Sequence, residues 1–326
     1  MHTALRDRSA PAPCTVPAAP ASALVERTWA GRAMGGGLAL RVVAPAAETA
    51  RADAALAATA ARIGAWAARL TRYTETSDLA LLNADPSAPE VAVRPTLAAV
   101  LRAAAASAVA TDGLLDVTLL DARLGAESGD ATPVLPVAWS LADGPRGSAR
   151  VLRAGPCRFD LDGVAKGAIA DRALALLRRW PAALVDADGD IALRTGRGRT
   201  WEIAVADPRD PDADLAILAL DDRVAGGSHG IATSGTSVHR WPDGPDRTPR
   251  HHLIDPRTGR PARTDLVQVT VLAGDAHRAE VLAKSALIAG TDAGLALLDA
   301  ANVRAAILLR ADGDVLATPG SPAWLA

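Results

Sequence analysis

Hydrophobic and polar residues follow each other along the chain with two different periods, which predict a mixture of helices and strands. Over residues 47–70, 95–110, 165–180 and 276–290, apolar residues recur every three or four positions, as on one face of a helix. Shorter apolar runs bounded by turn residues predict strands. These runs lie at residues 38–43, 137–141, 148–152, 182–185, 200–206, 215–220, 266–273, 305–309 and 315–317.

The predicted elements alternate irregularly, which indicates an α+β (mixed α/β) fold with a largely antiparallel or mixed sheet flanked by helices. Residues 114–120 are a further candidate strand, and the rest of residues 121–150 is expected to form loops. Residues 1–27 are rich in proline and alanine, which predicts a disordered tail. One domain is expected over residues 28–320, followed by a short tail at residues 321–326.

The composition excludes several classes of protein. A net charge of -2 over 326 residues provides no basic surface for nucleic acid or an anionic membrane. Two cysteines, Cys14 and Cys157, give neither a disulfide framework nor metal-ligand spacing. No apolar run is long enough to cross a bilayer, and no secretory h-region precedes Cys14. These features predict a cytoplasmic protein without a transmembrane segment.

Residues 160–167, with the sequence Asp-Leu-Asp-Gly-Val-Ala-Lys-Gly, combine a turn with the start of a helix. Free backbone N–H groups and the helix dipole make such a helix start suitable for an anion. Lys166 lies here, and Lys166 and Lys284 are the only lysines in a chain with 35 basic side chains. An ammonium is a compact charge, whereas a guanidinium is a wide fork. Each lysine therefore either occupies a site where only a small cation fits or has been kept by chance on a solvent-exposed face.

Further candidate residues lie in polar segments, and each also has a structural explanation. Tyr73, the only tyrosine, suits stacking on a ring or ordinary packing. The glycines after Met34 let the backbone approach a ligand, or they form a hairpin end. Residues 228–237 are small and hydroxyl-rich, as in loops that contact phosphate or sugar. His252 suits general-base chemistry near neutral pH, but with Asp255 it also suits a tied-down Pro–Gly turn.

Seven motifs in order resemble those of the FAD:protein FMN transferases of the ApbE type. They lie at residues 34–35, 73–83, 113–118, 160–171, 185–191, 232–235 and 252–261. The strings at 160–171 and 252–261 are the longest and most specific. A Gly-x-Gly-x-x-Gly after a strand and a Walker A sequence are both missing, so a nucleotide would be bound by other means. The resemblance implies an ApbE-like fold with a ligand cleft between two lobes.

The resemblance implies an enzyme that moves FMN from FAD onto a Thr or Ser hydroxyl of an acceptor protein and releases AMP, with Mg²⁺. Attack on a pyrophosphate requires charge neutralisation, an oriented hydroxyl and a proton acceptor. The implied catalytic residues are His252, Asp255 and Lys166, with Lys166 at the pyrophosphate. The implied FAD-binding residues are Met34, Tyr73, Asp116, Val117, Thr118, Asp160, Lys166, Thr233, Ser234 and Ile254.

The chain departs from this family at the metal site, which the resemblance places at a loop oxygen near Gly163 and at positions 280 and 284. Glu280 keeps a carboxylate for a hard cation, and His277 stands at another acidic position. Lys284 cannot bind a metal while protonated, and its ammonium is a candidate substitute for Mg²⁺. Alternatively, Glu280 and Lys284 form a surface pair worth about 0.3–0.5 kcal/mol. Weak or absent Mg²⁺ dependence is the expectation.

Asp162 and Asp188 also replace family glycines and add negative charge near the expected phosphates. This charge favours either a retained Mg²⁺ or a shifted loop. Three functions therefore stay open: transfer of FMN to a protein, hydrolysis of FAD to FMN and AMP, and binding of FAD without catalysis. For a transferase, the expected partner is an acceptor protein carrying a short Ser/Thr flavinylation motif.

Overall fold

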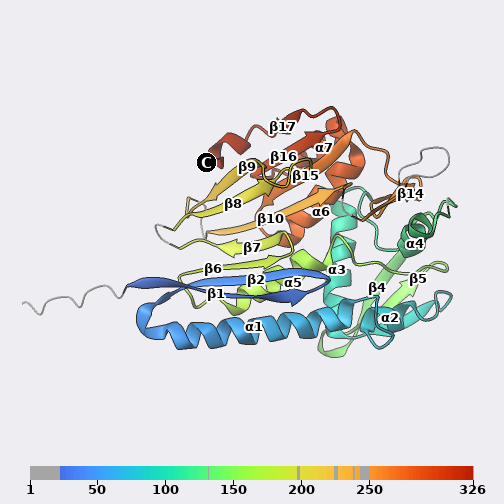
Figure 1. Ribbon diagram of the computed structural model, residues 1–326. Helices are drawn as coiled ribbons and strands as arrows, with labels where there is room; N and C mark the ends of the chain where they lie inside the picture. The colour runs from blue at the N-terminus through green and yellow to red at the C-terminus, as the bar shows by residue number, and fades with distance from the viewer. Residues whose placement is uncertain are drawn as a thin grey trace, which may run out of the picture.

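The computed structural model describes residues 23–130, 132–196, 199–223, 227–237, 239–242 and 250–325. Its main feature is an eight-stranded sheet with the order β1-β2-β6-β7-β10-β15-β16-β17, in which every neighbouring pair is antiparallel (Figure 1). Its strands are β1 (Leu24–Ala33), β2 (Gly36–Pro45), β6 (Ala182–Ala187), β7 (Asp190–Arg194), β10 (Ser228–Gly235), β15 (Leu266–Ala273), β16 (Ala305–Arg310) and β17 (Val315–Ala317). The predicted α+β class with a largely antiparallel sheet is confirmed.

Helices cover one face of this sheet (Figure 1). They are α1 (Thr49–Leu70), α5 (Ala165–Leu176), α6 (Ala276–Ala289) and α7 (Thr291–Ala300). The periodic apolar residues of α1, including Leu56, Ile63 and Trp66, are buried in one core cluster with β2, β6 and α5. α5 is shorter than the predicted helix over 165–180, and α7 was not predicted. No helix in the described part of the chain is long and apolar enough to cross a membrane.

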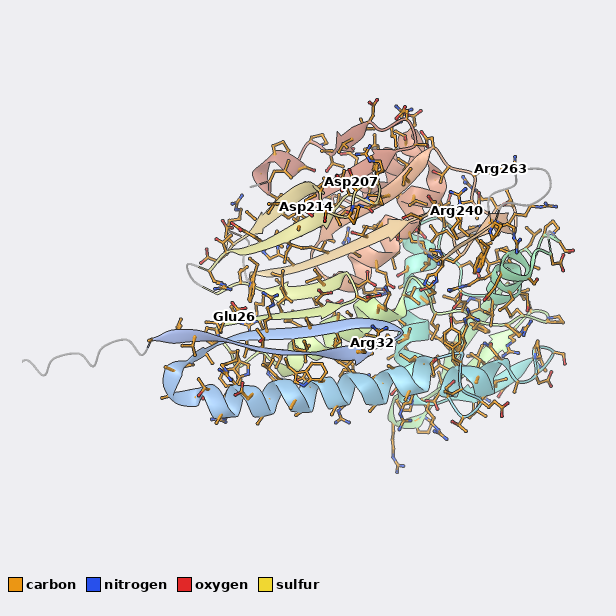
Figure 2. The ribbon with its side chains drawn as sticks, in the orientation of Figure 1. Glu26, Arg32, Asp207, Asp214, Arg240 and Arg263 are labelled. Carbon is orange, nitrogen blue, oxygen red and sulfur yellow. The ribbon has the colours of Figure 1, made fainter. Side chains whose placement is uncertain are left out.

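The other face of the sheet is covered by a pair of strands, β8 (Trp201–Ala206) and β9 (Asp214–Leu220). Figure 2 shows Asp207 and Asp214 at one end of this pair. Trp324 is buried in the same core cluster, so the prediction of a tail at 321–326 is wrong for this residue. The central strands are apolar on both sides because both faces are covered.

The N-terminal prediction also needs a correction. β1 begins at Leu24, so the strand includes the last four residues of the predicted tail at 1–27. Residues 1–22 of that tail lie outside the described residues. Met34 and Gly35 connect β1 to β2 and both have positive φ, 53° and 86°, as a two-residue hairpin turn requires. The hairpin explanation of these glycines is therefore confirmed.

A smaller lobe is built around the three-stranded sheet β3-β5-β4. Its elements are α2 (Asp78–Asn83), β3 (Glu90–Val93), α3 (Pro95–Ala110), α4 (Leu120–Ser128), β4 (Trp139–Asp143) and β5 (Ala149–Arg153). The strands predicted at residues 137–141 and 148–152 are confirmed as β4 and β5. The prediction of a strand at 114–120 is wrong because Asp116 closes a turn, accepting hydrogen bonds from the Thr118 N–H and hydroxyl. Residues 120–128 form α4 rather than the predicted loop.

Short strands lie beside α4: β11 (Arg240–Trp241) pairs with β12 (Arg250–His251), and β13 (Ile254–Asp255) pairs with β14 (Arg260–Pro261). Figure 2 shows Arg240 and Arg263 on this side of the molecule. Ile254 packs with residues of α4 in a small apolar cluster. This packing holds the segment that carries His252 against the smaller lobe.

The N-terminus of α6 packs tightly against α5. A Cβ on Gly167 of α5 would lie 2.6 Å from the Ala276 carbonyl oxygen, so these two helices approach at backbone contact. Asp171 of α5 accepts hydrogen bonds from the N–H groups of Ala276 and His277, both at 2.9 Å. These contacts fix α6 against the start of α5, where Lys166 lies.

Asp171 provides a test of this contact between α5 and α6. Burial raises the pKa of its carboxyl to about 6, against the lowering effect of the two N–H donors. A raised pKa means that the ionised carboxylate destabilises the folded state. This penalty is lost as the pH falls through 6 and the carboxyl takes up a proton. Relative to Asp171→Asn, the wild type should gain about 1 kcal/mol of unfolding free energy between pH 7 and pH 5. Urea unfolding of both proteins at each pH measures this difference, and parallel curves would contradict it.

Candidate active site

A small polar cavity of about 20 Å³, enough for about one water molecule, lies where loops of the smaller lobe meet the main one. Its lining residues are Leu114, Asp116, Leu119, Arg123, Asp160, Asp162, His252, Ile254 and Lys284. Five of them were predicted from the sequence as functional positions: Asp116, Asp160, His252, Ile254 and Lys284. The fold thus brings together residues that lie up to about 170 positions apart.

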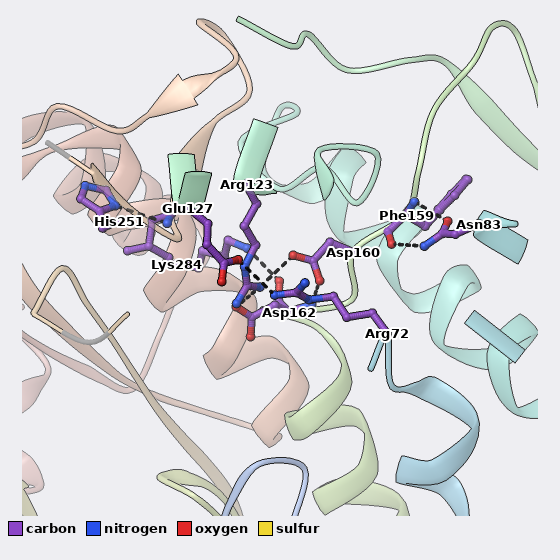
Figure 3. A network of polar contacts seen from close by, with 10 residues as sticks. Arg72, Asn83, Arg123, Glu127, Phe159, Asp160, Asp162, His251 and Lys284 are labelled. Carbon is purple, nitrogen blue, oxygen red and sulfur yellow. Dashed lines mark hydrogen bonds and ion pairs between the residues drawn. The ribbon is translucent and has the colours of Figure 1, made fainter. Parts of the chain in front are cut away.

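Arg123 of α4 is the central cation of this cavity (Figure 3). Its Nη1 donates hydrogen bonds to Asp160 Oδ2 at 2.8 Å and to Asp162 Oδ2 at 2.6 Å. Burial would lower the pKa of Arg123, but the two carboxylates outweigh it and raise that pKa. Burial opposes ionisation of Asp162 as well, yet Arg123 and Lys284 hold its pKa below the usual value. Arg123 and Asp162 are therefore both charged at neutral pH.

Lys284 of α6 approaches the same loop from the other side. Its Nζ donates a hydrogen bond to the Asp162 carbonyl oxygen at 2.8 Å. Gly163, with φ of 94°, makes room for it, since a Cβ there would lie 2.5 Å from Lys284 Cδ. Glu280 is buried and its Oε2 accepts a hydrogen bond from the Gly167 N–H. The predicted alternative, a surface pair of Glu280 and Lys284, is therefore wrong.

Lys166 lies behind the cavity rather than in its lining. Its Nζ is 2.9 Å from the buried Asp190 Oδ2. Burial raises the pKa of Asp190 to about 6 and raises that of Glu280 well above its ordinary value. The glycine-containing start of α5 thus holds an acidic group of its own chain, and the ammonium of Lys166 compensates a buried carboxyl.

Asp116, Val117 and Thr118 form the turn at one wall of the cavity. Asp116 lines the cavity, and burial raises the pKa of its carboxyl despite two hydrogen bonds from Thr118. Thr118 is buried, and its hydroxyl also accepts a hydrogen bond from the Val137 N–H at 3.0 Å. The Val117 side chain packs in the main core. Asp116 alone of the three presents its side chain to the cavity.

His252 lines the cavity, and its buried Nδ1 has no hydrogen-bond partner among the residues that the structure describes. Burial lowers the pKa of its imidazole to about 3, so the ring is neutral at physiological pH. Asp255 points elsewhere: its carboxylate accepts hydrogen bonds from the Arg257 N–H and guanidinium at 2.8–3.2 Å. Asp255 therefore holds the turn, and the geometry gives it no contact with His252.

Other predicted ligand residues lie outside the lining. Tyr73 is 76% exposed, and the Arg72 guanidinium lies 4.5 Å from the centre of its ring. Residues 228–237 are not the predicted loop, since β10 is a central strand, which follows from its pairing with β7 and β15. Thr233 on this strand shares a hydrogen bond with the Thr270 hydroxyl at 2.8 Å. Met34 and Ser234 are likewise absent from the cavity lining.

Sequence reasoning missed Arg123, because the helix that carries it was not predicted. It also gave no role to Asn83 beyond its motif. The Asn83 side chain binds the backbone N–H and carbonyl of Phe159 at 2.7 and 2.8 Å, beside the cavity loop (Figure 3). Asn83 therefore fixes the backbone immediately before Asp160.

The positions that the family resemblance gives to a metal do not fit a divalent ion. No group of three or more His, Cys, Asp or Glu residues suited to a metal occurs in the described residues. His277 is engaged with the Ser107 hydroxyl and the Val164 carbonyl at 2.9 and 3.2 Å. Lys284 places its ammonium on the Asp162 carbonyl oxygen. Glu280 bonds to the backbone of α5 through Oε2, and its Oε1 is buried without a hydrogen-bond partner among the described residues. One unengaged oxygen is too few ligands for a divalent ion.

The fold and the cavity define a two-lobed α+β protein with a cavity lined by charged residues at the meeting of its lobes. A model of the ApbE family matches residues 34–308. Because this match covers most of the chain, the chain belongs to the ApbE family.

Relatives and solved structures agree with this family. The chain is 33% identical over 136 residues to a FAD:protein FMN transferase of Salmonella typhimurium, and 31% identical over 153 residues to one of Treponema pallidum. These matches span 40% and 43% of this chain but only 37% and 40% of the two relatives. The apo crystal structure of the Pseudomonas stutzeri flavinyl transferase ApbE matches with a TM-score of 0.72 over 92% of this chain and 97% of that chain, at 23% identity. The Thermotoga maritima ApbE protein gives a TM-score of 0.75 at 22% identity, over 93% of this chain and all of that chain.

Proposed function

We propose that this protein is a FAD:protein FMN transferase, which moves FMN from FAD onto a Ser or Thr hydroxyl of an acceptor protein and releases AMP. One observation carries the proposal: in a member of the ApbE family, Arg123, Lys284 and the neutral His252 converge on one cavity. Cations next to a neutral proton acceptor suit nucleophilic attack on a diphosphate.

In the proposed reaction, the acceptor hydroxyl oxygen forms a bond to the FMN phosphorus. The bond from this phosphorus to the bridging oxygen breaks, and AMP leaves with that oxygen. His252 takes the proton of the hydroxyl, since burial keeps its ring neutral. Arg123 and Lys284 stabilise the charge on the diphosphate. No step is assigned to a divalent ion, because the residues present do not fit one.

The remaining predicted residues have supporting roles in this proposal. Tyr73 offers an exposed ring for stacking on flavin or adenine. Thr118 holds Asp116 in place, and Lys166 holds the start of α5 through Asp190. We assign Met34, Thr233 and Ser234 to more distant parts of the dinucleotide, since they lie outside the cavity lining.

The test combines the purified protein, FAD and a synthetic peptide that carries an Asp- and Thr-containing motif. The expected result is AMP release together with a peptide whose mass increases by that of FMN less water. A matched peptide with Val in place of Thr should acquire no flavin. Free FMN with AMP would instead show a hydrolase, and intact FAD bound to the protein would show a binding protein. Either outcome would contradict the proposal.

A further inference from the structure

Arg123 and Lys284 are joined through a single residue, Asp162 (Figure 3). The guanidinium of Arg123 holds the Asp162 carboxylate at 2.6 Å, and the ammonium of Lys284 holds its carbonyl oxygen at 2.8 Å. The two cations therefore lie on opposite sides of one loop residue and line the same cavity. Their positions depend on each other because they share this anchor.

Both cations keep donors for a ligand. The Arg123 side chain is only 8% exposed, and its Nε–H is buried without a hydrogen-bond partner among the described residues. An ammonium has three N–H donors, and one hydrogen bond of Lys284, that to Asp162, is identified. Buried donors without partners are costly. A ligand with several acceptor oxygens, such as a diphosphate, would satisfy them.

The acidic residues around the cavity are already engaged by the protein. Asp160 and Asp162 share Arg123, and Asp116 accepts two hydrogen bonds from Thr118. Glu280 does not line the cavity: its Oε2 accepts a hydrogen bond from the backbone of α5, and its Oε1 is buried without a partner among the described residues. A divalent cation needs several oxygen ligands at short range, and it would have to displace Lys284 from the Asp162 carbonyl oxygen. Two like charges at this position would repel each other.

We infer that this chain binds the diphosphate of FAD without a divalent metal ion, and that Arg123 and Lys284, anchored on Asp162, supply the positive charge. The inference rests on the proposed function in that FAD is taken as the ligand. Arg123 and Lys284 together carry the formal charge of one divalent ion, part of which Asp160 and Asp162 offset. The extra carboxylate of Asp162 then has a purpose, since it holds Arg123 in place before the ligand arrives, while the backbone carbonyl of the same residue holds Lys284.

Calorimetry of FAD binding tests this inference. The wild-type protein is treated with EDTA and titrated with FAD, once without metal and once with millimolar Mg²⁺. The expected dissociation constants agree within about twofold, and titration with Mg²⁺ alone gives no binding heat. Lys284→Met should weaken FAD binding by about 10–100-fold in both conditions, because it removes a charge-assisted contact. Arg178→Met, which removes an exposed cation at the end of α5, should leave binding unchanged.

The outcomes separate this inference from the proposed function. FAD that binds tightly only with Mg²⁺, or Lys284→Met that binds FAD as tightly as the wild type, would overturn the inference even if flavin transfer occurs. Equal binding with and without Mg²⁺ but no transfer to any peptide would support the inference and contradict the transferase. A folded wild-type protein that binds no FAD in either condition would overturn both.

Discussion

Replacing His252 with alanine is expected to lower the rate of flavin transfer by about 10²–10⁴-fold, the usual contribution of a general base. The imidazole lines the cavity with its Nδ1 unpartnered among the described residues. Burial lowers its pKa to about 3, so the ring is neutral and free to accept a proton. A bound diphosphate would raise this pKa toward working pH, because negative charge favours the imidazolium. Single-turnover measurement of AMP release with saturating FAD checks the effect on chemistry.

Two matched variants make the His252 result specific. His252→Gln keeps a polar side chain but cannot take a proton, so it should lose about as much activity as His252→Ala. His239→Ala removes an exposed ring that packs edge-on against His252 at 5.3 Å, and it should change the rate only a few-fold. If His252→Ala folds and transfers flavin at the wild-type rate, His252 is not the proton acceptor.

Replacing Gly230 with alanine is expected to destabilise the fold by about 3 kcal/mol or more, the upper range for overpacking against a rigid neighbour. A Cβ at this position of β10 would lie 1.9–2.2 Å from backbone atoms of Asp275 and Ala276. Backbone atoms cannot move aside as a flexible side chain can. The shift would displace the N-terminus of α6, the helix that carries Glu280 and Lys284. Urea unfolding measures the loss, and FAD calorimetry checks the site.

Gly64 provides the matched control for Gly230. It lies on the exposed side of α1, and a Cβ there would meet no atom within 4 Å. Gly64→Ala should therefore stabilise the protein by about 0.5–1 kcal/mol, because alanine loses less backbone freedom in a helix. A Gly230→Ala protein as stable as the wild type would show that the contact between β10 and α6 is not tight.

The sequence predicted an element best where the apolar residues of that element pack against a continuous layer of other elements. α1 and α3 were found because their apolar residues recur on one face, and β15 and β16 because they are apolar runs between turns. It failed at α4 and at residues 114–120. There the short Asp116–Thr118 turn overrides an apolar run that suits a strand. A side-chain hydrogen bond to the next residues competes with regular structure, and apolar periodicity does not record it.

The candidate site shows the same division. Asp116, Asp160, His252 and Lys284 belong to motifs and were predicted. Arg123 could not be predicted, since its partners Asp160 and Asp162 lie 37 and 39 positions away. Asp255 and Lys166 were predicted as catalytic, but the structure pairs them with Arg257 and Asp190.

By itself, the sequence determined the type and order of most elements, the lack of a dinucleotide fingerprint and the family resemblance, because these depend on local spacing and motif order. Only the tertiary structure decided which charges meet. It placed Lys284 on the Asp162 carbonyl oxygen and turned Glu280 toward the start of α5. The physical reason is that a charged side chain takes its properties from the groups around it, and in this protein those groups come from distant parts of the chain.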